Sequence, residues 1–130
     1  MIIVVDFDGT CVTHDFPSVG KDIGAVPVLK ALVAKGHKLI LFTMRDNRVI
    51  GNTTSLNEAV KWFKKNDIEL LSANFNPSQD RWSGSPKVFA HLYIDDTALG
   101  IPLKYDQTVS GRPFVDWEKV EQMLKENDIL

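Results

Sequence analysis

The chain has 130 residues, of which 44% are apolar and 25% charged, and its formal net charge is −2. This length and composition predict one soluble domain spanning residues 1–130. The slightly negative charge argues against an extended nucleic-acid-binding surface. No apolar run approaches the length of a transmembrane helix, and the single cysteine, Cys11, cannot form an internal disulfide. We therefore expect a cytoplasmic protein with no membrane association.

The predicted elements alternate between short apolar strands and amphipathic helices. Because the strands are continuous apolar runs, they favour a parallel sheet. The expected fold is α/β, with a single Rossmann-like parallel sheet and helices on both of its faces. In chain order, the elements are strand Ile2–Val5, helix Val26–Lys35, strand Lys38–Phe42, a helix that begins near Ser55 with Glu58 in a capping box, strand Ile68–Leu71, strand His91–Ile94 and helix Asp116–Lys125.

Polar side chains follow three of the predicted strands at the points where these strands end. Asp6 and Asp8 come after the first strand, Thr43 after the second, and Asp95 and Asp96 after the last. Parallel strands bring their carboxyl ends to one edge of the sheet, where ligands of open α/β sheets bind. Carboxylate oxygens are hard ligands that suit Mg²⁺, which is often shared with phosphate oxygens. The pattern therefore predicts a magnesium site at this edge.

Two basic residues lie close in sequence to these acids. Lys87 is a few residues upstream of the last acidic pair, and Arg45 is two residues after Thr43. The combined set contains a nucleophile, an acid/base group, a metal site, a hydroxyl donor and a cation. These groups are sufficient for phosphoryl transfer through an aspartyl-phosphate. Arg45 is the best candidate for a charge that projects from its loop and contacts substrate, and the alternative is a surface salt bridge, which would be worth little.

Four sequence motifs resemble those of the haloacid dehalogenase superfamily, in its phosphatase branch. They are VVDFDGT at residues 4–10, LILFTMR with Thr43 at its hydroxyl position, SPK with Lys87, and LYIDD ending in Asp95 and Asp96. The four motifs occur in the order of that superfamily. The resemblance implies a phosphohydrolase with the fold of that superfamily.

The resemblance also implies a role for each acidic residue. Asp6 would be the nucleophile and a ligand of Mg²⁺. Asp8 would protonate the leaving oxygen and then deprotonate water, and its main-chain carbonyl would be a further metal ligand. Asp95 would bind Mg²⁺, and Asp96 would bind it directly or through water. The acid at position 8 resembles the one that phosphatases and phosphomutases of the superfamily carry there. The sequence leaves open which of these two reactions the protein catalyses.

The remaining motif residues would contact the substrate or shape the loop around it. Thr43 and Lys87 would hold the transferring phosphoryl oxygens, and Gly9 would permit a tight turn beside the substrate. Contacts of His14, Asn74 and Asn76 with substrate stay undecided.

The two long predicted loops are too short to hold a second domain. Residues 11–25 and 72–86 are the places where larger members of that superfamily carry a cap domain, so we expect no cap domain and an open site. A second subunit could cover such a site, which would make the protein a homo-oligomer. The partner would be a phosphorylated small molecule or a phosphorylated macromolecule.

Two alternatives to a phosphatase remain. A receiver-type signalling domain also gathers acids, a Thr and a Lys at one sheet edge, but its phosphorylated Asp ends a middle strand. A non-catalytic metal-binding or interaction module on the same fold is the other alternative. Turnover of a generic aryl phosphate distinguishes all three.

Overall fold

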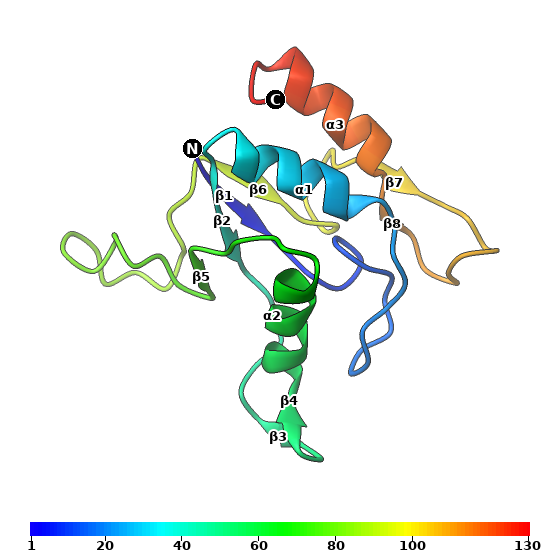
Figure 1. Cartoon of the computed structure of the whole chain (residues 1–130), viewed down its shortest axis with the longest axis horizontal. Helices are drawn as coiled ribbons and strands as arrows, with labels where there is room; N and C mark the ends of the chain where they lie inside the picture. The colour runs from blue at the N-terminus through cyan, green and yellow to red at the C-terminus, as the bar shows by residue number, and fades with distance from the viewer.

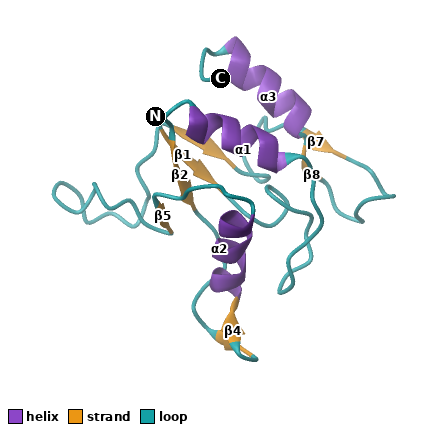
Figure 2. Cartoon of the chain, in the orientation of Figure 1, coloured by secondary structure: helices purple, strands orange, loops and turns teal.

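The computed structural model describes all residues 1–130, and a parallel β-sheet lies at its centre (Figures 1 and 2). Adjacent strands of the sheet run in the same direction, with Val5 opposite both Leu41 and Ile94. The sheet order is β5–β2–β1–β6, made of β1 (Ile2–Val5), β2 (Lys38–Leu41), β5 (Ser72–Ala73) and β6 (Leu92–Ile94). All four carboxyl ends therefore lie at one edge, as the sequence predicts.

Three amphipathic helices complete the mixed α/β domain. Their buried residues recur every three or four positions, such as Val28, Leu29 and Leu32 in the first helix and Val120 and Leu124 in the last. Burial of each such aliphatic side chain contributes roughly 1.5–3 kcal/mol. The helices are α1 (Ala25–Ala34), α2 (Ser55–Lys65) and α3 (Trp117–Glu126).

The two faces of the sheet are covered differently, and the expectation of helices on both faces is wrong. Ile3 and Val5 point to one face and belong to a buried cluster that contains residues from all three helices; α1 crosses in front of the sheet in Figure 1. Val4 and Ile40 point to the other face and pack against Val88, without any helical residue in their cluster. A loop therefore covers the second face.

The helix caps differ from the predicted capping box by one residue. Thr54, rather than Ser55, keeps an extended backbone, and its hydroxyl accepts a 3.0 Å hydrogen bond from the Asn57 amide. The Glu58 carboxylate accepts a 2.8 Å hydrogen bond from the hydroxyl of Thr53. The side chain of Asp116 caps α3 as its N-cap residue, one residue before the helix begins.

The predicted strand at Ile68–Leu71 is wrong, and the pairing occurs a few residues later, at β5. The Ile68 amide donates to the Phe63 carbonyl at 2.9 Å, so this apolar residue closes the end of α2 and packs in the core. The structure also contains two short hairpins, each with strands of two residues, that the sequence did not predict. They are β3 (Val49–Ile50) with β4 (Thr53–Thr54), and β7 (Leu103–Lys104) with β8 (Phe114–Val115).

The long loops contain no additional domain. Residues 11–25 form no helix before α1 begins, and residues 74–91 contain neither a helix nor a strand. The fold is therefore a single domain without a cap. None of the three helices is both long and apolar enough to span a bilayer.

Candidate functional site

The carboxyl edge of the sheet gathers three of the predicted acids. Asp6 follows β1, while Asp95 and Asp96 follow β6, the neighbouring strand. One carboxylate oxygen from each residue lies within 4.8 Å of the other two. We call Asp6, Asp95 and Asp96 the acidic triad. Strand pairing produces it, because the Asp6 amide donates to the Ile94 carbonyl at 3.0 Å and so aligns the two strand ends.

The electrostatics of the acidic triad are unfavourable without a cation. Burial is the main cause that raises the pKa of Asp6 from 3.8 to about 7, and the charges of Asp95 and Asp96 contribute to the rise, while hydrogen bonds from the Phe7 amide and the Thr10 hydroxyl oppose it. Three converging carboxylates, one of them hard to ionise, form a hard oxygen donor set. This donor set fits Mg²⁺, which prefers carboxylate oxygens and retains water or phosphate ligands.

Thr10 connects two members of the acidic triad, a role that the sequence reasoning missed. Its fully buried hydroxyl donates to Asp6 Oδ2 at 3.0 Å and accepts from the Asp96 amide at 3.0 Å. The same hydroxyl oxygen lies 3.4 Å from Asp96 Oδ1. The sequence did contain a signal for this role, because Thr10 is the last residue of the motif DFDGT. The hydroxyl aligns the ends of β1 and β6 at the level of the side chains.

The loop after the first motif brings His14 to the acidic triad. His14 Nε2 lies 2.9 Å from Asp96 Oδ2. Gly9 adopts φ +78°, and a Cβ there would lie 2.1 Å from His14 Nε2 and 2.6 Å from Asp96 Oδ2. Glycine is therefore required at position 9 both for its backbone conformation and for the approach of His14. Contact between Gly9 and a substrate stays a prediction.

Asp8 is separated from the acidic triad by an ion pair with Arg45. Its Oδ1 and Oδ2 accept hydrogen bonds from Arg45 Nη2 at 2.7 Å and Nε at 2.8 Å. Arg45 is only 2% exposed. The expectation that Arg45 projects from its loop is therefore wrong, because the guanidinium turns inward and binds Asp8.

Thr43 lies at the end of β2 with one hydrogen-bonding function still free. Its amide donates to Asn74 Oδ1 at 2.8 Å, and its hydroxyl accepts from the Arg45 amide at 3.1 Å. No protein group accepts the hydroxyl proton of Thr43, so this proton is available to a ligand. Asn74 also donates to the Arg45 carbonyl at 3.3 Å. Asn74 therefore holds the loop that carries Thr43.

Lys87 is not brought to the acidic triad. Its side chain is exposed, and its ammonium makes no hydrogen bond or ion pair; its backbone is held by Ser85 and Gln79. Asn76 is 3% exposed and holds its own loop together. Its side-chain amide donates to the Phe89 carbonyl, and its side-chain oxygen accepts from the Ser78 amide.

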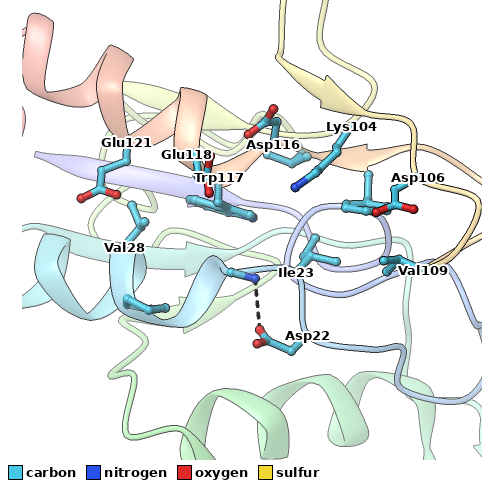
Figure 3. Close-up of a pocket in the computed structure, with 14 residues that line it drawn as sticks. Asp22, Ile23, Val28, Lys104, Asp106, Val109, Asp116, Trp117, Glu118 and Glu121 are labelled. Carbon is cyan, nitrogen blue, oxygen red and sulfur yellow. Dashed lines mark hydrogen bonds between the residues drawn. The ribbon is translucent and has the colours of Figure 1, made fainter.

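A cavity of about 300 Å³ lies between α1, α3 and the β7–β8 hairpin (Figure 3). None of its lining residues belongs to the acidic triad. Two of them nevertheless hold the loop of the first motif. Trp117 Nε1 donates to the Thr10 carbonyl at 2.7 Å, and the Val115 amide donates to the Gly9 carbonyl at 3.0 Å.

Comparison with known proteins identifies a structural relative. No family model matches the chain, and no curated protein matches it. The solved structure of a conserved protein coded by a locus of Bacteroides thetaiotaomicron is similar, with a TM-score of 0.76 and 35% sequence identity. The match covers 98% of this chain and 91% of that chain. At this identity and coverage, the chain belongs to the same family as the conserved Bacteroides thetaiotaomicron protein.

Proposed function

We propose that this protein is a Mg²⁺-dependent phosphohydrolase of the haloacid dehalogenase superfamily that cleaves phosphate monoesters through an aspartyl-phosphate on Asp6. The acidic triad is the observation that carries the proposal, because its three carboxylates converge within 4.8 Å at the ligand-binding edge of a parallel sheet. A bound cation would relieve the mutual repulsion of these carboxylates, and the motif order supports the assignment to this superfamily.

The acidic triad would hold the metal, with Asp6 also serving as the nucleophile. Bound Mg²⁺ would supply charge neutralisation for a phosphate dianion that approaches the triad. Thr10 keeps one Asp6 oxygen oriented through its 3.0 Å hydrogen bond. The other Asp6 oxygen is left for attack on phosphorus, and the attack places the phosphoryl group on Asp6.

Two further residues would act on the phosphoryl group and the leaving group. The free hydroxyl proton of Thr43 supports a hydrogen bond to a phosphoryl oxygen. Asp8 would donate a proton to the leaving oxygen and later accept one from the attacking water. Lys87 remains a proposed phosphoryl ligand, since its ammonium has no partner within the protein; the loop 74–91 would have to carry it to the site. Arg45 is not proposed to contact substrate.

The open site is compatible with substrates of very different size. Without a cap domain, either a phosphorylated small molecule or a phosphorylated macromolecule could reach Asp6. The expected location is the cytoplasm, and a second subunit that covers the site remains a proposal.

The test is phosphatase activity of the purified, metal-stripped protein. Hydrolysis of p-nitrophenyl phosphate and of a panel of phosphorylated metabolites is measured with and without added Mg²⁺. We expect Mg²⁺-dependent turnover by the wild type and none by Asp6→Asn. Asp15→Asn serves as the matched control, because Asp15 is an exposed acid in the neighbouring loop. Phosphorylation without turnover would indicate a receiver-type domain, and metal binding without either would indicate the non-catalytic alternative.

A further inference from the structure

The guanidinium group of Arg45 uses every hydrogen-bond donor that it has. Two of its five N–H groups bind the Asp8 carboxylate, and the other three bind backbone carbonyls. The carbonyl partners are Ser18 at 2.7 Å from Nη2, and Pro17 at 3.2 Å and Ser55 at 3.1 Å from Nη1. The guanidinium therefore joins the first motif, the following loop and the start of α2.

Aromatic rings cover the guanidinium on two sides. Its central carbon lies 4.9 Å from the centroid of the Phe7 ring and 5.3 Å from that of Phe16. Phe7 is fully buried, whereas Phe16 is 60% exposed and forms the outer cover. The ion pair with Asp8 is thus largely removed from water, unlike a surface salt bridge of small energetic value.

The position of the Asp8 carboxylate follows from this arrangement. Three carbonyl groups determine where the guanidinium lies, two from adjacent residues of the loop after the first motif and one from the start of α2. The guanidinium therefore acts as a fixed support. Asp8 is the one side chain that the guanidinium hydrogen-bonds, and the bidentate interaction fixes both of its carboxylate oxygens. As a result, Asp8 stays outside the acidic triad although it is only two residues from Asp6.

We propose that Arg45 is a positioning residue that keeps the Asp8 carboxylate, as distinct from its main-chain carbonyl, out of the metal site and available as the acid/base group. This inference rests on the proposed function and extends it. In the first step, the bond between phosphorus and the leaving oxygen breaks, the bond to Asp6 forms, and a proton of Asp8 passes to the leaving oxygen. In the second step, water attacks phosphorus, its proton passes to Asp8, and inorganic phosphate leaves with Asp6 restored.

A lysine at position 45 separates the positioning role from simple charge. Lysine retains the positive charge, but it has only three donors and no planar fork. It cannot bind both Asp8 oxygens and also all three carbonyl groups. Arg48→Lys is the matched control, because Arg48 lies on the same loop, is 89% exposed and pairs with Asp46 at 3.0 Å.

The first experiment compares two substrates that differ in their need for a proton. Nitrophenolate leaves without protonation, whereas the alkoxide of n-propyl phosphate requires it. The comparison uses kcat/KM, which reports formation of the aspartyl-phosphate and not its hydrolysis, a step that both substrates share. We expect Arg45→Lys to lower kcat/KM on n-propyl phosphate roughly 100-fold and kcat/KM on p-nitrophenyl phosphate less than about threefold. Arg48→Lys should match the wild type on both substrates. Equal losses of kcat/KM on the two substrates would overturn the proposal.

The second experiment reports on Asp8 without requiring turnover. Calorimetry measures Mg²⁺ affinity in the wild type, in Arg45→Lys and in Arg45→Lys/Asp8→Asn. Released from Arg45, the Asp8 carboxylate should join the metal site and raise Mg²⁺ affinity at least about threefold, and the double variant should lose this gain. An unchanged affinity in Arg45→Lys would overturn the positioning role. If the wild type binds Mg²⁺ but turns over no phosphate ester, the proposed function fails and this measurement alone decides the role of Arg45.

A milder variant keeps the inference testable if Arg45→Lys does not fold. Phe16→Leu removes the exposed ring over the guanidinium but leaves every hydrogen bond of Arg45 in place. The ion pair should loosen as water reaches it, and kcat/KM on n-propyl phosphate should fall about threefold more than kcat/KM on p-nitrophenyl phosphate. Equal relative changes in kcat/KM on both substrates would overturn the proposal.

Discussion

Asp6 has the most perturbed carboxyl group at the candidate site. Burial, together with the neighbouring charges of Asp95 and Asp96, raises its pKa from 3.8 to about 7. In the metal-free protein, Asp6 therefore holds a proton over a pH range in which an unfolded chain has lost it. Unfolding releases this proton, so the stability of the metal-free protein depends on pH.

The direction of this dependence follows from the raised pKa. Below pH 3.8 both states are protonated, and Asp6 causes no loss of stability. Between about pH 4 and pH 7 the unfolded state ionises first, so the free energy of unfolding falls by about 1.4 kcal/mol per pH unit, up to about 4 kcal/mol in all. Urea unfolding in chelator at several pH values measures this effect. Asp6→Asn should lack this part of the slope, and identical slopes in both proteins would contradict the assignment.

The sequence predicts the acidic triad better than it predicts the partners of the triad. Asp6, Asp95 and Asp96 follow apolar strands, and parallel pairing alone brings them together. The position of Arg45 depends on three carbonyl groups from two other segments, the loop at Pro17–Ser18 and the start of α2, and no local pattern encodes that arrangement. A loop arginine is usually exposed, so the prediction of a surface arginine followed the general tendency and was wrong.

At the scale of elements, α3 supports the site loop from outside. The Trp117 indole is 3% exposed and donates a 2.7 Å hydrogen bond to the Thr10 carbonyl. The Thr10 hydroxyl in turn binds Asp6 and the Asp96 amide. The first residue of α3 therefore contributes to the alignment of the acidic triad, although it lies more than a hundred residues from Asp6.

Trp117→Phe should destabilise the protein and loosen this alignment. The substitution leaves the buried Thr10 carbonyl without its partner, which costs about 1–3 kcal/mol in addition to lost packing. Trp62→Phe is the control, since it removes the same atoms from an indole that donates no hydrogen bond within the protein. Chemical denaturation of both variants provides the comparison. A larger loss for Trp62→Phe than for Trp117→Phe would contradict the role of the hydrogen bond.

Continuous apolar strands and periodic helices are the elements that the sequence predicts well. The strands β1 and β2 and all three helices lie within one or two residues of their expected ranges. The β3–β4 and β7–β8 hairpins have strands of two residues, too short for a period to appear. The apolar run at Ile68–Leu71 has strand-like composition but serves to close α2 and pack in the core, so tertiary packing overrides its local preference.

At the scale of the molecule, the helices occupy one side of the parallel sheet. The opposite face, around Val4 and Ile40, is covered only by the loop that contains Val88. The single-sided arrangement could not be predicted, because continuous apolar strands are equally compatible with a helix or a loop on either face. The acidic triad lies at the carboxyl ends of β1 and β6, so a metal bound there would connect these two adjacent central strands.

Mg²⁺ should therefore stabilise the entire fold. A ligand that binds only the native state raises stability by RT ln(1 + [L]/Kd), about 2.7 kcal/mol at a hundredfold excess over Kd. Thermal unfolding is measured in chelator and with increasing Mg²⁺. We expect the melting temperature of the wild type to rise, and that of Asp95→Asn to rise much less. Exposed Asp80 provides a control, since Asp80→Asn should respond as the wild type does. Equal responses of Asp95→Asn and the wild type would place the metal elsewhere.

Phosphorylation of Asp6 is the step on which the proposed function depends most directly. Asp8→Asn should still be phosphorylated by p-nitrophenyl phosphate with Mg²⁺, because nitrophenolate needs no proton, but it should lose the phosphoryl group slowly, since no base activates water. Acid quenching followed by peptide mass spectrometry locates the label, with Asp6→Asn/Asp8→Asn as the control. We predict one phosphoryl group on Asp6 in Asp8→Asn and none in the double variant. Label on His14 or Thr43, or product formation with Asp6 never labelled, would contradict the aspartyl-phosphate mechanism.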